Sequence, residues 1–219
     1  MQLDTSIRIR LAEGIVERLA AAAPGSEAVL WGSLAEQRAD QYSDIDVLWD
    51  VPDALFGTCV ATVRDILSTL HPVESFRSDP EWQNADKRRL FFVRFAAVPL
   101  FWRLDLDVYA RSIYRDHTYD AGNPRARAYD WSWTESALAN GVAAVKACLR
   151  HDEGEARVLL ERAYRRVGLA MPQGEVRDLI LNLATEVEHM DAQTTGFAQR
   201  LTQLVADAFS IRAGSGLAQ

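Results

Sequence analysis

Two aspartates at the start of an apolar run constrain this chain more than any other feature. Asp44 and Asp46 flank Ile45, and residues 45–49 read Ile-Asp-Val-Leu-Trp, a pattern that predicts a buried strand. Side chains two residues apart on a strand point to the same face, so both carboxylates should project together. Like charges that close repel unless a cation lies between them, and paired carboxylates are ligands that suit Mg²⁺.

A glycine–serine pair precedes this strand. Gly32 and Ser33 follow a short predicted strand at residues 27–31. Glycine lets the backbone approach a phosphate closely, and consecutive N–H groups in a turn favour bound anions. Either motif alone is more often a turn or a solvated edge. Together, and in this order, they predict nucleoside-triphosphate chemistry.

A second acidic strand is predicted at residues 101–109. Leu104, Leu106 and Val108 alternate with polar residues, and the polar face carries Asp105 and Asp107. An amphipathic strand with a solvated acidic face is the ordinary interpretation of such a pattern. If this strand lies beside the first one, however, three or four carboxylates converge, as in a two-metal phosphoryl-transfer site.

These motifs resemble the DNA polymerase beta-like nucleotidyltransferase superfamily, and within it the kanamycin (aminoglycoside) nucleotidyltransferases. The resemblance covers roughly residues 28–110. It implies that Asp44, Asp46 and Asp105 hold two Mg²⁺ ions, and it makes Asp107 a further catalytic acid. It also implies an NTP co-substrate, foremost ATP, and a homodimer whose chains share sites.

One expected residue of the antibiotic-modifying relatives has no clear match. They use a glutamate on a helix of the second domain as the base. Glu135 lies near that region, but its position three residues after Ser132 is typical of a helix-capping box. The acceptor and its base are therefore left open by the sequence.

The expected fold is α+β in two parts. Residues 1–125 should form a mixed sheet with flanking helices, the nucleotidyltransferase domain. Residues 126–219 should form a helical bundle for substrate binding or dimerisation, with helices near 133–150, 153–168, 174–190 and 195–211.

Several side chains outside the acidic motifs were assigned from their local pattern. Ser43 and Lys146 are expected to join Gly32 and Ser33 in nucleotide binding. Trp31 and Trp49 are expected in the core, and the two cysteines are expected as buried free thiols. The arginines of the strand before the acidic one, Arg88, Arg89 and Arg94, are interpreted as a solvated charge cluster.

Charge and hydropathy restrict the partners. The net charge of −7 argues against nucleic acid as a partner, and no apolar run is long enough to span a membrane. A cytoplasmic location is expected. The predicted activity is transfer of a nucleoside monophosphate, foremost AMP, to a hydroxyl of a small molecule such as an aminoglycoside-like antibiotic, with release of pyrophosphate. The alternatives are modification of a protein or tRNA, as in toxin–antitoxin systems, and a non-catalytic nucleotide-binding regulator.

Overall fold

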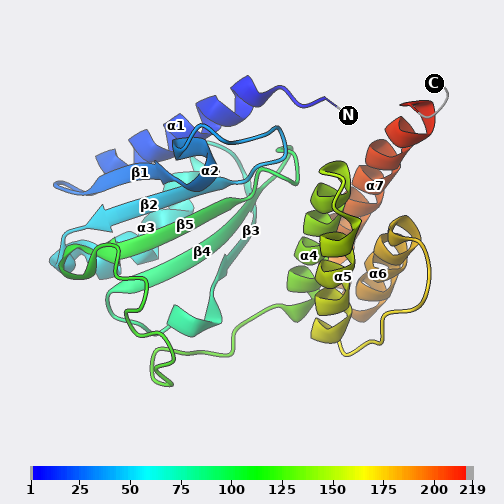
Figure 1. The fold of residues 1–219 in the computed structure, drawn as a ribbon. Coiled ribbons are helices and arrows are strands. Elements are labelled where there is room, and N and C mark those ends of the chain that lie inside the picture. The colour runs from blue at the N-terminus through cyan, green and yellow to red at the C-terminus, as the bar shows by residue number, and fades with distance from the viewer. Residues whose placement is uncertain (1, 216–219) are drawn as a thin grey trace. The chain divides into compact units, whose positions relative to one another are not determined.

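The computed structural model describes residues 2–215, and these divide into two compact units, Gln2–Trp131 and the part from Ser132 onward. The predicted helical domain extends to residue 219, and residues 216–219 lie outside the described residues. The fold class is α+β, as the sequence predicts: a five-stranded mixed sheet with helices comes first, and an all-helical part follows (Figure 1).

The first unit is built around the sheet, whose strand order is β1-β2-β5-β4-β3. The strands are β1 (Glu27–Trp31), β2 (Ile45–Val51), β3 (Val73–Ser78), β4 (Arg88–Phe95) and β5 (Leu104–Ala110). The neighbours β2 and β5 are parallel, and the other three pairs are antiparallel. The parallel pair at the centre brings the two acidic segments side by side, although they are far apart in the chain.

Alternation along the central strands separates an apolar face from a polar one. Ile45, Val47 and Trp49 are completely or almost completely buried, as are Leu104 and Leu106 of the neighbouring strand. Two helices, α1 (Thr5–Ala22) and α3 (Phe56–Ser68), pack against the sheet and against each other (Figure 1). The aspartates occupy the intervening positions, so burying the apolar set fixes the face on which the carboxylates lie.

Two short pieces of this unit connect β1 to the acidic strand β2. The single helical turn α2 (Gly32–Ala35) follows β1, and a turn at residues 40–43 precedes β2. Arg8 of α1 is buried and donates through Nη1 to the backbone oxygens of Asp40, at 2.6 Å, and of Ser43, at 2.8 Å. Burial lowers the pKa of Arg8, while Asp40 and Asp44 oppose that shift. The first helix thereby holds the segment that leads into β2.

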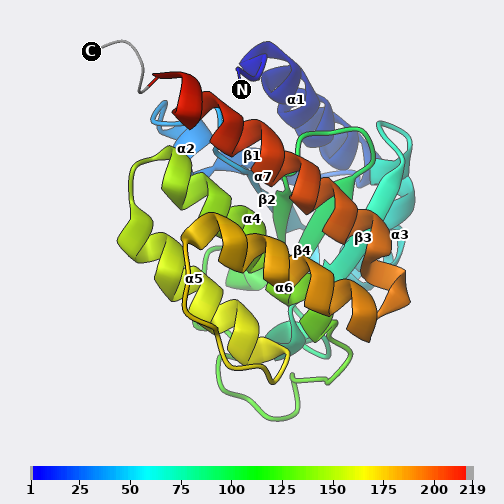
Figure 2. The same cartoon turned by 90° about the vertical axis from the view of Figure 1, so that its right-hand side faces the viewer.

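The second unit contains α4 (Trp133–Leu149), α5 (Glu153–Arg166), α6 (Val176–Met190) and α7 (Thr195–Ser215). These helices pack on one another as a bundle (Figures 1 and 2). Ser132 caps α4 by accepting from the Glu135 backbone N–H at 3.1 Å, the capping role expected of this pair. None of the helices in residues 2–215 is long and apolar enough to cross a membrane.

The structure corrects two side-chain placements expected from sequence. Trp49 is fully buried as predicted, but Trp31 is 41% exposed because it ends β1. Arg88 is buried rather than solvated, while Arg94 pairs with Glu74 at 3.0 Å. Both cysteines are free and buried, as predicted.

Candidate active site

The two acidic strands are in register at their aspartates. The Cα partner of Asp46 on β2 is Asp105 on β5, and Asp107 lies opposite Leu48. Partners in a parallel pair share a face, so Asp46 and Asp105 project from the same side of the sheet. Asp44 lies two residues before Asp46 and ends the turn that leads into β2. The predicted juxtaposition of the two acidic motifs is therefore present.

Gly32, the residue that follows the neighbouring strand β1, lies close to the Asp46 carboxylate. Its φ is +62°, a conformation that favours glycine, and a Cβ atom built on it would lie 2.7 Å from Oδ2 of Asp46. A side chain at this position would collide with the carboxylate. The turn after β1 thus brings bare backbone against one of the carboxylates, and the predicted close approach of this backbone to a phosphate stays a prediction.

Arg103 forms a fork on the third carboxylate. Its Nε donates to Oδ1 of Asp105 at 2.6 Å, and its Nη2 donates to Oδ2 at 2.7 Å. Burial disfavours the charged guanidinium, but the carboxylates of Asp105, Asp44 and Asp46 outweigh that effect and raise the pKa of Arg103. The arginine is therefore the cation of this cluster, and sequence reasoning did not identify it. The two-residue spacing from Asp105 on an extended strand was the available signal.

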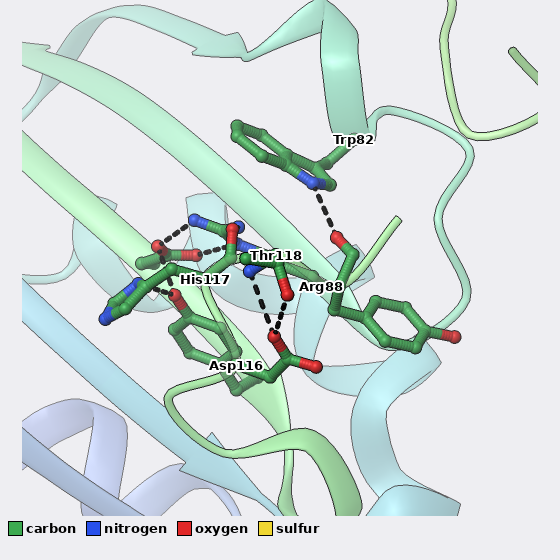
Figure 3. Close-up of polar contacts among 8 residues, drawn as sticks. Trp82, Arg88, Asp116, His117 and Thr118 are labelled. Atoms are coloured by element: carbon green, nitrogen blue, oxygen red, sulfur yellow. Dashed lines mark hydrogen bonds and ion pairs between the residues drawn. The ribbon is translucent and has the colours of Figure 1, made fainter. Parts of the chain in front are cut away.

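The side chain of Asp107 is buried in a different set of contacts. Arg88 donates to it from Nε at 3.2 Å and from Nη2 at 2.9 Å, and the Tyr109 hydroxyl donates at 2.8 Å (Figure 3). Burial and the Asp107 carboxylate both raise the pKa of Tyr109. A carboxylate satisfied by three donors serves the packing of the sheet. Its predicted part in catalysis remains a prediction without a contact to support it.

The other predicted nucleotide-binding residues are placed as follows. Ser43 is buried, and its hydroxyl accepts from the Asp40 backbone N–H at 3.1 Å and donates to the Asp40 carboxylate at 3.0 Å. Those bonds shape the turn before β2. Ser33 lies in α2 beside Gly32. Lys146 is half-buried in the last turn of α4, in the helical unit.

Within the described residues, the aspartates supply the donor type that a hard divalent cation prefers but are not grouped closely enough to enclose one. Asp44, Asp46 and Asp105 offer only oxygen, the donor that Mg²⁺ prefers, and the Gly32 backbone lies close to the Asp46 carboxylate. Within residues 2–215, no three His, Cys, Asp or Glu side chains are grouped closely enough to hold a metal ion. In the arrangement described, Arg103 balances the charge of Asp105.

Comparison with known proteins adds distant structural likenesses. No family model matches this sequence, and no curated protein does. A solved structure of the GLD-2/RNP-8 complex is similar with a TM-score of 0.38 and 12% identity, covering 84% of this chain and 78% of that one. The polymerase core of TRAMP, an RNA surveillance complex, is similar with a TM-score of 0.37 and 13% identity, covering 94% of this chain and 57% of that one. A protein from H. pylori described as a nucleotidyltransferase is similar with a TM-score of 0.31 and 12% identity, covering 95% of this chain and 96% of that one.

Likeness at these scores is too weak to decide an activity. Each of the three is less than 15% identical to this chain, with a TM-score below 0.4. The case for function therefore has to come from the side chains of the site itself.

Proposed function

We propose that this protein is a Mg²⁺-dependent nucleotidyltransferase that moves a nucleoside monophosphate, foremost AMP from ATP, to a hydroxyl group and releases pyrophosphate. The observation that carries the proposal is the register of β2 and β5, which sets Asp46 beside Asp105. Gly32 lies directly against the Asp46 carboxylate. A carboxylate pair with bare backbone beside it suits a cation–phosphate ligand.

The residues take distinct roles in this proposal. Asp44 and Asp46 would hold Mg²⁺, and Gly32 and Ser33 would face the β- and γ-phosphates. Bound there, Mg²⁺ would neutralise charge on the phosphate oxygens and orient the triphosphate. Asp105 would complete the cation site and accept the proton of the attacking hydroxyl. Ser43 would contribute to nucleotide binding indirectly, because its hydrogen bonds to Asp40 fix the turn that precedes Asp44.

The acceptor is proposed to be a small molecule that carries amines, of the aminoglycoside kind. The net charge of −7 and the acidic face of the central strands both favour a cationic acceptor over a polyanion. A protein or tRNA acceptor is the alternative within the same chemistry. Lys146, as a further nucleotide contact, and a shared homodimer site are parts of this proposal that await testing.

One contact favours a second candidate, a nucleotide-binding regulator without transfer activity. Arg103 engages both oxygens of Asp105, at 2.6 and 2.7 Å, so the third carboxylate is fully paired as described. If that pair persisted with Mg²⁺-ATP bound, Asp105 could neither complete the cation site nor accept a proton. Binding would then occur without chemistry.

A labelling experiment decides among these candidates. The full chain is incubated with Mg²⁺ and each of the four NTPs labelled at the α-phosphate, together with aminoglycosides, total tRNA or a protein extract. Label on an aminoglycoside supports the small-molecule proposal, and label on tRNA or protein supports the alternative. Binding of ATP by wild type with no transfer to any acceptor supports the regulator.

A further inference from the structure

An exposed tryptophan lies in the same row of the sheet as the carboxylates. Trp31 is the last residue of β1, its Cα partner is Asp46, and it is 41% exposed. Partners in an antiparallel pair share a face, so the indole and the Asp46 carboxylate are on the same side. Gly32, the glycine that contacts Asp46, is the next residue. A large aromatic ring is costly to expose, and this one is next to the proposed phosphate site.

Two exposed residues of the loop that follows β5, Arg115 and His117, lie against Trp31. The guanidinium carbon of Arg115 is 5.2 Å from the indole centroid and 5.0 Å from the ring of Tyr114. The His117 ring centroid is 6.4 Å from that of Trp31, with the planes tilted by 40°. Arg115 has a φ of +61°, which a side chain of its size rarely adopts. The three residues form one aromatic and cationic surface, here named the Trp31 surface.

Partly buried contacts hold the loop after β5 in place. Arg88, the partner of Asp107, also donates through Nη1 to the His117 backbone oxygen at 2.7 Å (Figure 3). The indole N–H of Trp82 donates to the Tyr119 backbone oxygen at 3.0 Å, and the Arg88 guanidinium carbon lies 3.9 Å from the Trp82 ring centroid. The side-chain nitrogen Nδ1 of His117 is 2.9 Å from the Tyr109 hydroxyl.

The buried pair of Arg88 and Asp107 is one of these anchors. The pair fixes a loop whose exposed side chains would otherwise be free to move away from Trp31. Pre-positioned aromatic and cationic groups lose little entropy when a flat ligand stacks on them. The arrangement has the features of a ligand surface, because an exposed indole with held cationic and aromatic neighbours lies beside the proposed phosphate site.

We propose that the Trp31 surface binds the base of the nucleoside triphosphate whose phosphates lie at Gly32 and Asp46. The base would stack on the face of the indole that Arg115 does not cover, so that the indole lies between the base and the guanidinium. Stacking on aromatic rings accepts any base, because every base has a π face. This inference rests on the proposed function, since it takes the phosphate end of the ligand to lie beside Asp46.

Two ligands separate the base from the phosphates. Titration calorimetry measures binding of Mg²⁺-ATP and of Mg²⁺-tripolyphosphate, which has no base, to the full chain and to Trp31→Leu. The substitution keeps apolar bulk but removes the π face. We expect about tenfold weaker binding of ATP, from the energy typical of base stacking, and unchanged binding of tripolyphosphate. Trp31→Phe is the matched control and should retain most of the affinity.

The outcomes separate this inference from the proposed function. Equal affinity of Trp31→Leu and wild type for ATP, or equal weakening for both ligands, overturns the base-binding role. Asp46→Asn should weaken the binding of both ligands. If it changes the affinity for neither ligand, or if wild type binds neither, the proposed phosphate site is wrong as well. Arg115→Met, at an exposed position, is a second variant that should weaken the binding of ATP and leave the binding of tripolyphosphate unchanged. Circular dichroism checks the fold of each variant.

Discussion

The guanidinium of Arg103 donates hydrogen bonds to both carboxylate oxygens of Asp105, and the register partner of Asp105 on β2 is Asp46. The positive charge of Arg103 therefore lies among the carboxylates of Asp105, Asp46 and Asp44, which raise its pKa. A divalent cation bound at Asp44 and Asp46 would repel this guanidinium. The arginine and the metal are expected to compete for the charge of Asp105.

Replacing Arg103 with methionine should tighten metal binding. Methionine keeps an apolar stem near the Phe92 ring, from whose centroid the guanidinium carbon lies 5.0 Å, but it removes the positive charge. We expect Mn²⁺, used as a spectroscopic substitute for Mg²⁺, to bind several-fold more tightly by electron paramagnetic resonance titration. Arg94→Met is the matched control, because it removes an arginine that pairs with Glu74 elsewhere on β4. Weaker Mn²⁺ binding by Arg103→Met would show that the arginine supports the site.

Replacing Gly32 with alanine should damage the site more than the fold. The new Cβ would meet Oδ2 of Asp46 at 2.7 Å, and alanine at a φ of +62° adds backbone strain of about 1 kcal/mol. We expect the free energy of unfolding in urea to fall by about 1–2 kcal/mol. Mn²⁺ binding should weaken by tenfold or more, because Asp46 has to move. Gly57→Ala, where a Cβ meets nothing within 4 Å, is the control. Unchanged metal affinity in Gly32→Ala would place the cation away from Asp46.

Breaking the buried pair between Arg88 and Asp107 should cost stability. Their side chains are only 6% and 13% exposed, and removing one partner leaves a charge with no counter-ion in a poorly hydrated place. We expect Arg88→Met to lower the free energy of unfolding by about 3 kcal/mol in urea denaturation. Asp107→Asn keeps the shape and should cost less. If Asp107→Asn abolished transfer with the fold intact, the carboxylate would be catalytic, as the family resemblance suggests.

Local pattern in the sequence was enough to predict most elements and the acidic motifs. The alternation at residues 104–108 and the run at 45–49 predicted two strands with carboxylates on one face, and both strands are present. Which strands are neighbours was left conditional, because the pairing of β2 with β5 joins distant segments. The register that matches Asp46 with Asp105 comes from burying both apolar sets on the same side.

The errors came from contacts that no local pattern encodes. Arg88 looked like one member of a surface cluster, but Asp107, Trp82 and the loop after β5 bury it. Trp31 looked like a core residue because it ends an apolar strand, yet β1 is an edge strand and its last side chain stays exposed. Both residues are adjacent to the candidate site.

The fate of the γ-phosphate tests the central claim most directly. The full chain and Asp46→Asn are incubated with an acceptor, Mg²⁺ and ATP labelled at the γ-phosphate, and the released label is separated by chromatography. Nucleotidyl transfer predicts labelled pyrophosphate from wild type and none above background from Asp46→Asn, with an unchanged circular dichroism spectrum. Release of labelled inorganic phosphate, transfer of the label to the acceptor, or equal pyrophosphate release by both proteins would contradict an active site built on Asp46 and Asp105.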